Sequence, residues 1–233
     1  MNRILKPDRQ LYGTINLPAS KNISNRLLVL QFLHPERITL KNISPADDTV
    51  LLETLLHKIR QYMEGGRKKI LTLDIGNSNT VLSYLVALLS AIPGSYVLRG
   101  DKSSARRSVQ ILVNGLMELG ADIQFIENPG YLPLFIKGRN LFSRELTIKA
   151  SESNLQLSAL LLVSTVFTDG IRIVLEKRAD PGPYVDMTCR ILEISGFPTI
   201  RQEEMIRVFP GKNTKVAFNI EPDWNSASYW YGM

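Results

Sequence analysis

The sequence contains very few residues that crosslink a chain or bind metal. Among its 233 residues are one cysteine, Cys189, and two histidines, His34 and His57. A single cysteine cannot form an intrachain disulfide, which fits a reducing compartment such as the cytoplasm. One cysteine and two histidines also argue against a zinc site, which takes several such ligands. We therefore expect a cytoplasmic protein without a disulfide or a metal site.

Long apolar stretches are also missing. No uncharged run approaches the roughly 18–20 residues that cross a bilayer as a helix. The N-terminal stretch MNRILKPDRQLYG lacks the apolar core of a secretory signal. Apolar residues make up 44% and charged residues 21% of the sequence, as in ordinary soluble domains. We expect no membrane partner, and the length allows one large domain or two small ones.

The chain is basic, with a formal net charge of +6 at pH 7. A basic protein favours polyanionic partners, either phosphorylated small molecules or nucleic acid. The basic clusters GRKK at 66–69 and ARR at 105–107 are short, and they lack the interleaved aromatic residues that stack on bases. This pattern argues against nucleic acid. We interpret GRKK as a solvated turn, and a generic basic surface is the alternative explanation of the net charge.

A Ser-Asn pair stands at the start of three long apolar runs. Each run is apolar nearly all round, which predicts a helix that is buried on most sides. An amphipathic helical segment follows each run, from Asp47, Arg106 and Pro183. The last two segments end in Gly120 and Gly196, which are good C′ residues. The three pairs are Ser24-Asn25, Ser78-Asn79 and Ser153-Asn154.

Nine short runs rich in β-branched residues lie between these helices and predict strands. They are RITLKNI, ILTLDI, SYVLRG, DIQFI, LPLFIKG, ELTIKA, GIRIVLEK, TIRQ and MIRVFP. The order of elements is then β-α-β-α-β-β three times over, with a period of roughly 55–75 residues. We predict an α/β (α+β) fold over residues 13–218, in which a threefold repeat has buried parallel helices inside and sheets outside.

Parallel buried helices would bring their N-termini to one end of the domain. Helix N-termini carry unpaired N–H groups and a partial positive charge, so such an end binds phosphate or carboxylate groups. The stretch ASKNISNR at 19–26 fits this interpretation, because it has more hydrogen-bonding side chains than one helix cap requires. The alternative is that the three Ser-Asn pairs are independent helix caps.

The segment LPASKNISNR at 17–26 closely resembles the LP-x-SKS-x-SNR signature of the EPSP synthase family (3-phosphoshikimate 1-carboxyvinyltransferases). Further segments resemble that family in the same order, so the resemblance covers essentially the whole chain. They are ADDT at 46–49, IGNSNT at 75–80, LVNGLMELGADI at 112–123, NPGYLPLFIKG at 128–138, SESNLQLSALLL at 151–162, PGPYVDMT at 181–188 and EPDWNSASYWY at 221–231.

The resemblance implies a fold and a reaction. The family enzyme has two similar halves, each a threefold repeat of β-α-β-α-β-β units (an inside-out α/β barrel), and the substrates bind between them. It transfers the enolpyruvyl group of phosphoenolpyruvate to the 5-hydroxyl of shikimate 3-phosphate and releases phosphate, on the route to chorismate and the aromatic amino acids. It requires no metal or organic cofactor.

A second family is the alternative. The UDP-N-acetylglucosamine enolpyruvyl transferases share this fold, and Lys21-Asn22 also matches their Lys-Asn pair. The segments SNR, PYVDMT and DWNSASYWY are features of the shikimate family instead. The cysteine of the alternative family lies in a mobile loop, whereas Cys189 lies in a predicted helix. These features favour the shikimate family.

The resemblance also implies which residues bind the substrates. Lys21 would touch both substrates, and Arg26 would grip the carboxylate of shikimate, which a guanidinium fork suits well. Asn22 stands where the family has a serine. The implied contacts of shikimate 3-phosphate are Lys21, Asn22, Arg26, Ser153, Asn154 and Tyr184, and those of phosphoenolpyruvate are Lys21 and Asn77.

Several positions depart from the family pattern, mostly on the phosphoenolpyruvate side. Asn79 replaces a loop glycine, and it either crowds the phosphoenolpyruvate subsite or serves as a helix cap. Leu155 replaces a glutamine, and Gln156 stands one residue later, where a helical side chain is turned by about 100°. The other departures are Ser83 and Ser103 in place of arginines and Pro181 in place of a serine.

The resemblance assigns residues 1–12 and 219–233 to the second half of the family enzyme, which also supplies the catalytic aspartate and a lysine. No general acid or base is identifiable in this chain. The segment DWNSASYWYGM at 223–233 would expose four aromatic side chains, as a docking surface or an aggregation liability. Two hypotheses follow. The chain is an EPSP synthase-like transferase, or it is a truncated or split-enzyme half that at most binds shikimate 3-phosphate.

Overall fold

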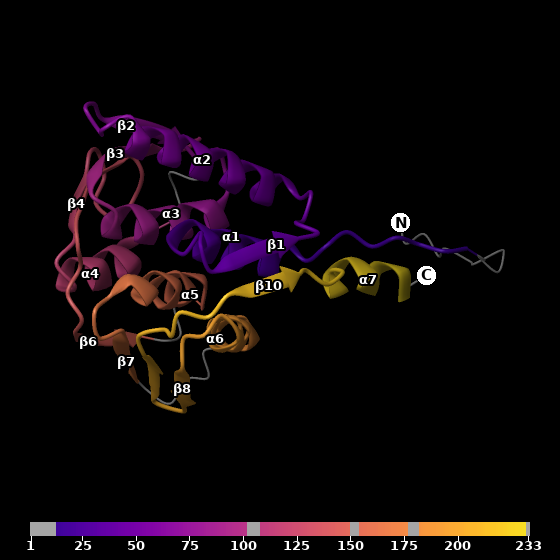
Figure 1. The fold of residues 1–233 in the computed structure, drawn as a ribbon. Coiled ribbons are helices and arrows are strands. Elements are labelled where there is room, and N and C mark those ends of the chain that lie inside the picture. The colour runs from indigo at the N-terminus through magenta and orange to yellow at the C-terminus, as the bar shows by residue number, and fades with distance from the viewer. Residues whose placement is uncertain (1–12, 102–107, 150–153, 177–181, 232–233) are drawn as a thin grey trace, which may run out of the picture.

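A computed structural model of the chain describes residues 13–101, 108–149, 154–176 and 182–231 (Figure 1). Two four-stranded sheets share one strand order, with a parallel first pair and then two antiparallel neighbours. The first sheet contains, in order across it, β2 (Leu71–Asp74), β3 (Gly94–Arg99), β5 (Leu134–Gly138) and β4 (Asp122–Phe125). The second contains, in the equivalent order, β6 (Glu145–Lys149), β7 (Ile171–Glu176), β9 (Met205–Val208) and β8 (Thr199–Gln202). They form the second and third units of the predicted repeat.

The first unit has a smaller sheet. Its strand β1 (Ile38–Lys41) pairs in parallel with β10 (Val216–Asn219), which the sequence pattern did not predict. All nine predicted strands, β1 to β9, are present. No hairpin like β4–β5 follows β1 within the described residues, because residues 65–70 connect α2 directly to β2. The GRKK stretch at 66–69 is exposed in this connection, as predicted for a solvated turn.

Three helices form the core, and each carries a predicted Ser-Asn pair near its start. They are α1 (Lys21–Leu33), α3 (Asn79–Ala91) and α5 (Asn154–Val163), which continues as the short 3-10 helix η2 (Ser164–Val166). α3 and α5 begin at the asparagine of the pair, whereas Ser24-Asn25 lies inside α1, whose cap position is Ser20. α3 is buried at every position from Val81 to its end, and α5 at every position from Gln156. α5 packs against both α1 and α3. A helix that is apolar on all sides requires such an enclosed position.

Three amphipathic helices lie around this core, and each buries one face. They are α2 (Asp47–Glu64), α4 (Gln110–Glu118) and α6 (Pro183–Ile194). α4 begins at Gln110, and Arg106, the predicted start, lies outside the described residues. Gly120 (φ +94°) and Gly196 (φ +85°) follow α4 and α6 in the left-handed conformation predicted for C′ residues. None of the described helices has the length and hydropathy of a membrane span.

The segment after β10 returns to the first unit. The backbone N–H of Ser20 donates to Glu221 O over 2.9 Å, and that of Asp223 donates to Pro18 O over 2.8 Å. α7 (Trp224–Tyr231) then extends away from the domain (Figure 1), and only Ala227 is buried among its residues. Its aromatic side chains are exposed, as predicted, by 70% at Trp224, 77% at Tyr229, 48% at Trp230 and 84% at Tyr231.

His34, just after α1, makes folding sensitive to acid. Its Nε2 lies 2.9 Å from Thr165 Oγ1, and burial, helped by the charge of Arg37, lowers the pKa of His34 from 6.5 to about 4. Between these two values the unfolded chain binds a proton that the folded chain does not, so stability is full above pH 6.5 and falls as the pH drops towards 4. We expect the free energy of unfolding in urea to be about 1 kcal/mol lower at pH 5 than at pH 7.5 through this group, after allowance for its partial exposure.

A pair of variants isolates this contribution. His34→Gln removes the titrating group, so the loss of stability between pH 7.5 and pH 5 should shrink. His57→Gln is the matched control, since His57 is exposed and is the other histidine of the chain. Equal pH dependence in His34→Gln and the unaltered chain would contradict the prediction.

Candidate anion-binding site

The first two turns of α1, α5 and α6 meet in one hydrogen-bonded cluster. Arg26 of α1 donates from Nε to Thr188 Oγ1 of α6 over 2.7 Å. Arg26 Nη2 also lies 3.4 Å from Ser158 Oγ of α5, and the Thr188 and Ser158 hydroxyl oxygens are 2.9 Å apart. The predicted gathering of buried-helix N-termini is therefore seen for α1 and α5, and the amphipathic helix α6, which was not part of that prediction, joins them.

α2 and α4 begin at the same end of the domain. Lys21 Nζ lies 3.3 Å from Asp48 Oδ2, in the first turn of α2. Gln156 Oε1 accepts from the backbone N–H of Leu112 in α4 over 3.1 Å, and its Nε2 donates to Ser108 O over 3.2 Å. The Gln156 amide is thus directed towards α4, in line with the expected rotation away from the substrate position. The N-termini of α1, α2, α4, α5 and α6 lie at this end of the domain, and the partial positive charges of their dipoles attract anions.

Arg26 is a buried cation with neutral partners. It is 2% exposed, and besides Thr188 and Ser158 its guanidinium donates to Asn22 O over 2.8 Å and Tyr184 O over 3.2 Å. No carboxylate contacts it within the described part of the chain. A desolvated charge without a counter-ion is costly, so this position favours the approach of an anion from outside.

Asn22 and Tyr184 line one pocket beside this cluster. Its volume is about 260 Å³, and residues 221–225 form part of its wall. Tyr184 is 42% exposed, and its ring centroid lies 5.9 Å from the Arg26 guanidinium carbon. The resemblance assigns residues 221–225 to the second half of the enzyme, and here they close the pocket beside two of the predicted shikimate 3-phosphate contacts.

Lys21 and Asn154 lie at the starts of α1 and α5. Lys21 is partly exposed in its ion pair with Asp48. Asn154 lies against Gly182, because a Cβ built on this glycine would come within 3.1 Å of Asn154 Nδ2. Gly182 has a φ of +76°, which glycine adopts without strain, and this lets α6 begin close to α5. Ser153, the remaining predicted contact of shikimate 3-phosphate, lies outside the described residues.

Asn77 lies in the loop before α3 and Asn79 at the start of that helix, and both are exposed. The cap of α3 is Ser78, whose Oγ accepts from the backbone N–H of Val81 over 3.2 Å. Asn79 is the first helical residue, so the interpretation of Asn79 as the helix cap is wrong. Its side chain lies at the surface, at a position where the resemblance places a glycine. The prediction that Asn79 crowds the phosphoenolpyruvate subsite therefore stays a prediction.

The other departures from the family pattern offer no replacement contacts. Ser83 is fully buried in α3, and its Oγ has no hydrogen-bond partner within the described residues. It therefore cannot reach a ligand as an arginine could. Leu155 packs against the hydrophobic core. Ser103 and Pro181 lie outside the described residues.

Ser158 and Thr188 were missed by the sequence reasoning. Both are 0% exposed, although each carries a hydroxyl group. Their spacing could have identified them, because Ser158 stands four residues after Asn154 and Thr188 four residues after Tyr184, and both earlier residues are predicted ligand contacts. At that spacing a helical serine or threonine reaches the backbone carbonyl of the preceding turn.

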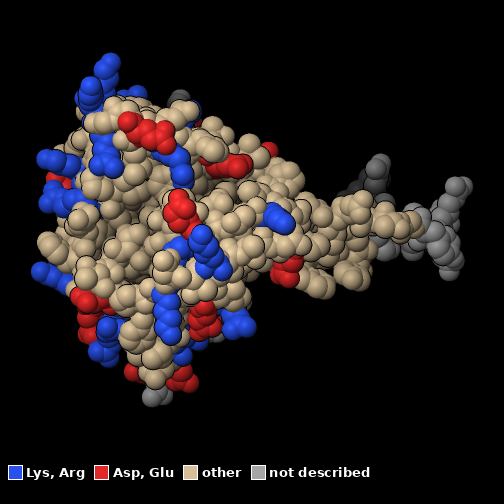
Figure 2. Space-filling model, viewed as in Figure 1, with Lys and Arg blue, Asp and Glu red and all other residues tan. Residues whose placement is uncertain are grey.

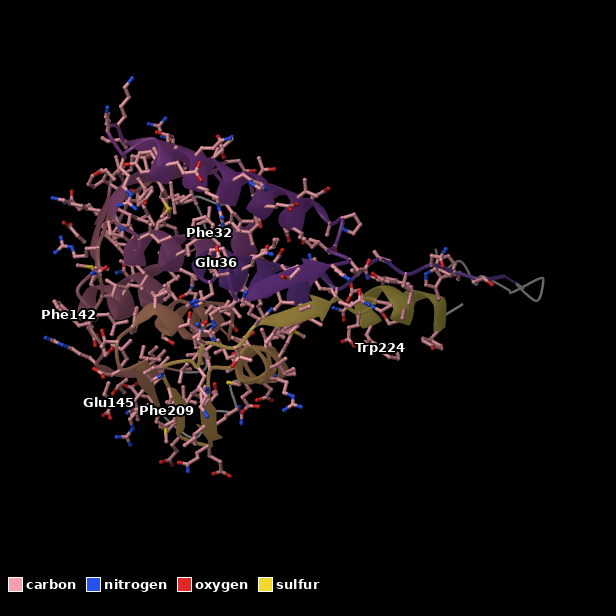
Figure 3. All side chains as sticks on the ribbon, in the orientation of Figure 1. Phe32, Glu36, Phe142, Glu145, Phe209 and Trp224 are labelled. Carbon is pink, nitrogen blue, oxygen red and sulfur yellow. The ribbon has the colours of Figure 1, made fainter. Side chains whose placement is uncertain are left out.

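Two larger hollows lie along the C-terminal half of α1. One of about 330 Å³ is between α1 and α2, near Phe32, which Figure 3 labels between α2 and β1. The other, of about 340 Å³, includes the last residues of α1, α2 and α3. Helix C-termini carry partial negative charge and repel anions, so the second hollow does not suit a phosphorylated ligand.

A threefold-repeat α/β domain with converging helix N-termini is a domain of the enolpyruvyl transferase type. Over residues 5–233 the chain matches the family model described as EPSP synthase (3-phosphoshikimate 1-carboxyvinyltransferase), and it belongs to that family. Cys189 lies in a helix, α6, as predicted, and its burial raises the pKa of its thiol to about 11. A thiol that stays protonated is a poor nucleophile, which agrees with this family rather than its cysteine-containing relative.

Curated relatives are longer than this chain. The 3-phosphoshikimate 1-carboxyvinyltransferase of Bacteroides fragilis strain YCH46 is 35% identical over 232 residues, which are 99% of this chain and 54% of the relative. That of Sulfurovum sp. strain NBC37-1 is 34% identical over 251 residues, which are 99% of this chain and 58% of the relative. The chain thus spans about half the length of the curated relatives it matches.

A solved EPSP synthase structure from Acinetobacter baumannii has the same fold. It superposes with a TM-score of 0.71 at 19% sequence identity. The match covers 94% of this chain and 52% of that structure. The predicted threefold-repeat fold, which the resemblance identifies as an enolpyruvyl transferase half-domain, is thereby confirmed.

Proposed function

We propose that this chain forms the shikimate 3-phosphate-binding half of a 3-phosphoshikimate 1-carboxyvinyltransferase. In the reaction, the 5-hydroxyl oxygen of shikimate 3-phosphate forms a C–O bond to the enolpyruvyl carbon of phosphoenolpyruvate. The C–O bond from that carbon to phosphate breaks, and phosphate leaves with the hydroxyl proton. The observation that carries the proposal is the cluster of Asn22, Arg26 and Tyr184 at converging helix N-termini, in a chain of this family.

In this proposal each charge of the ligand meets a feature of the site. The carboxylate of shikimate 3-phosphate binds over Asn22 and Tyr184, where buried Arg26 supplies positive charge. Its phosphate binds at the start of α5, at Ser153 and Asn154. Direct contact with the Arg26 guanidinium requires the protein oxygens around it to give way, since the side chain is 2% exposed.

Phosphoenolpyruvate would bind between the two halves, at Lys21 and Asn77. Lys21 leaves a partly exposed ion pair with Asp48, which costs little. The positions of Asn79, Ser83 and Ser103 have lost the family's contacts, and each lost charge-assisted hydrogen bond costs about 1.5–3 kcal/mol. Most of the affinity for phosphoenolpyruvate must therefore come from the second half.

Calorimetric titration with shikimate 3-phosphate tests the proposal. We expect saturable binding by the folded chain, weaker by at least about tenfold for shikimate, because the phosphate contacts are then missing. Lys21→Ala should weaken binding of shikimate 3-phosphate. Lys41→Ala is the matched control, since Lys41 is an exposed lysine on β1. No heat of binding at millimolar ligand, from a chain with a cooperative unfolding transition, would refute the proposal.

A second candidate is a non-catalytic module that at most binds shikimate 3-phosphate. The observation that favours it is the loss of phosphoenolpyruvate contacts, including the fully buried Ser83 where the family has an arginine. The two candidates differ in one respect. Only the first produces turnover when the chain is combined with a second half, which would dock on α7.

A further inference from the structure

Three buried side chains each hold the backbone carbonyl four residues before them. Arg26 Nη1 donates to Asn22 O over 2.8 Å, and Ser158 Oγ donates to Asn154 O over 2.8 Å. Thr188 Oγ1 lies 2.9 Å from Tyr184 O. The residues held in this way, one on each of α1, α5 and α6, are proposed contacts of shikimate 3-phosphate.

The three side chains also bond to one another. Thr188 Oγ1 accepts from Arg26 Nε over 2.7 Å, the shortest contact that Arg26 makes within the described residues. The proton of Thr188 is then directed to Tyr184 O or to Ser158 Oγ, and the proton of Ser158 to Asn154 O. In this series of hydrogen bonds, the donated protons therefore all point away from the guanidinium and towards the first turns of α5 and α6.

We propose that Thr188 is a positioning residue, with Ser158 behind it. Its hydroxyl group fixes the Arg26 guanidinium between α1, α5 and α6, and so sets the spacing of Asn22, Asn154 and Tyr184 around the ligand. The proposal rests on the function proposed above, because it explains how that site is held. Thr188 touches no ligand itself, since it is 0% exposed.

The physical reason is the fixed geometry of a buried arginine. Without an acceptor at Nε, a guanidinium in a space with few polar groups turns to find another. Rotation of Arg26 releases Asn22 O and Tyr184 O together, because both are bound by the same guanidinium. Valine has nearly the shape of threonine but no hydroxyl group, so Thr188→Val removes the acceptor and little else.

A ligand-free spectrum gives the first test. The Nε–H signal of Arg26 is identified in an ¹⁵N spectrum as the signal lost in Arg26→Lys. In the unaltered chain we expect this proton to exchange slowly with water, because it is buried and hydrogen-bonded. Thr188→Val should speed its exchange by at least about tenfold, and Thr188→Ser, which restores an acceptor, should slow it again.

Binding gives the second test, by calorimetry with shikimate 3-phosphate on the same samples. Thr188→Val should weaken affinity by about tenfold or more, and Thr188→Ser by much less. Thr165→Val is the matched control. Thr165 is a buried threonine whose Oγ1 donates to Leu162 O over 2.8 Å at the other end of the core, so its loss should lower stability without changing affinity.

The outcomes separate this proposal from the function on which it rests. If the unaltered chain does not bind shikimate 3-phosphate, the proposed function fails, and the exchange rate alone decides whether Thr188 holds Arg26. Unchanged exchange in Thr188→Val, or affinity within twofold of the unaltered chain, overturns the proposal. If Thr188→Val does not fold, Ser158→Ala removes the next hydroxyl group in this series of hydrogen bonds. It must then speed the exchange of the Arg26 Nε–H and weaken the affinity for shikimate 3-phosphate, both by less than Thr188→Val would.

Discussion

Mixing this chain with the second half of the Bacteroides fragilis relative is expected to start a release of phosphate that neither piece gives alone. This chain spans 54% of that relative, and the family resemblance implies that the catalytic aspartate and a lysine come from the other part. A positioned general acid or base contributes about 10²–10⁴-fold to a rate. Turnover of the mixture, measured as phosphate release with both substrates, should therefore exceed that of either piece by at least about 100-fold.

The proposed docking surface is α7, for which the structure gives few intramolecular contacts. Figure 2 shows charged side chains spread over the domain body, whereas the surface of α7 is largely uncharged. Tyr229 and Trp230 are 77% and 48% exposed there. Exposed tyrosine and tryptophan side chains dominate the energy of many interfaces, so the double replacement by alanine should reduce turnover of the mixture about tenfold or more at limiting concentration.

A control variant separates docking from a general effect of aromatic loss. Phe142 is 56% exposed and lies at the opposite end of the molecule from Trp224, as Figure 3 shows. Phe142→Ala should leave turnover of the mixture unchanged. Full turnover by the α7 variant would reject α7 as the docking surface. A mixture that releases no phosphate, while this chain still binds shikimate 3-phosphate, would favour the non-catalytic module.

The core could be predicted from sequence because its signal is local. An apolar run without a polar face requires burial on all sides, and α3 is indeed buried from Val81 to Ala91. The two complete sheets were predictable for the same reason, since their strands are short runs of β-branched residues between turn residues.

β10 could not be predicted in this way. Its four residues, Val216–Asn219, alternate between partly buried and exposed positions, and the apolar run among them is only three residues long. The strand exists because it pairs with β1, which lies far away in the sequence. Pairing over such a distance depends on the assembled helices and leaves no mark in a short window of sequence.

The candidate site was predictable at its surface and not beneath it. Family motifs pointed to Asn22, Asn154 and Tyr184, which the structure gathers around the first turns of three helices. Ser158 stands in an apolar helical run and Thr188 on the buried face of amphipathic α6, and at such positions a small hydroxyl residue resembles an ordinary core residue. Their importance lies in contacts between helices, which no single run contains.

Replacing Arg26 with methionine is expected to remove binding of shikimate 3-phosphate and to leave the domain folded. Methionine keeps the unbranched apolar stem of arginine and lacks its guanidinium, so the variant no longer buries a charge without a counter-ion. The acceptors that lose Arg26 keep other partners. Asn22 O and Tyr184 O are helix carbonyls that bond to backbone N–H groups, and the hydroxyls of Thr188 and Ser158 still bond to each other.

The free energy of unfolding in urea should therefore change by less than about 2 kcal/mol, whereas affinity by calorimetry should fall by at least about 100-fold. Arg37→Met is the matched control. Arg37 donates to the backbone oxygen of Ser195 over 3.2 Å and lies 4.5 Å from the Phe197 ring centroid, at the other end of α1. Its loss should not change affinity.

The two quantities together decide what the buried charge is for. If Arg26 served only the fold, its replacement would mainly lower the free energy of unfolding. A loss above about 3 kcal/mol in Arg26→Met, with affinity for shikimate 3-phosphate within tenfold of the unaltered chain, would therefore contradict the proposed role. If Arg26 serves binding, its replacement mainly lowers the affinity for the anion and changes the stability of the ligand-free chain little. Because Arg26 contacts only neutral oxygens within the described residues, the second pattern is the one its surroundings predict.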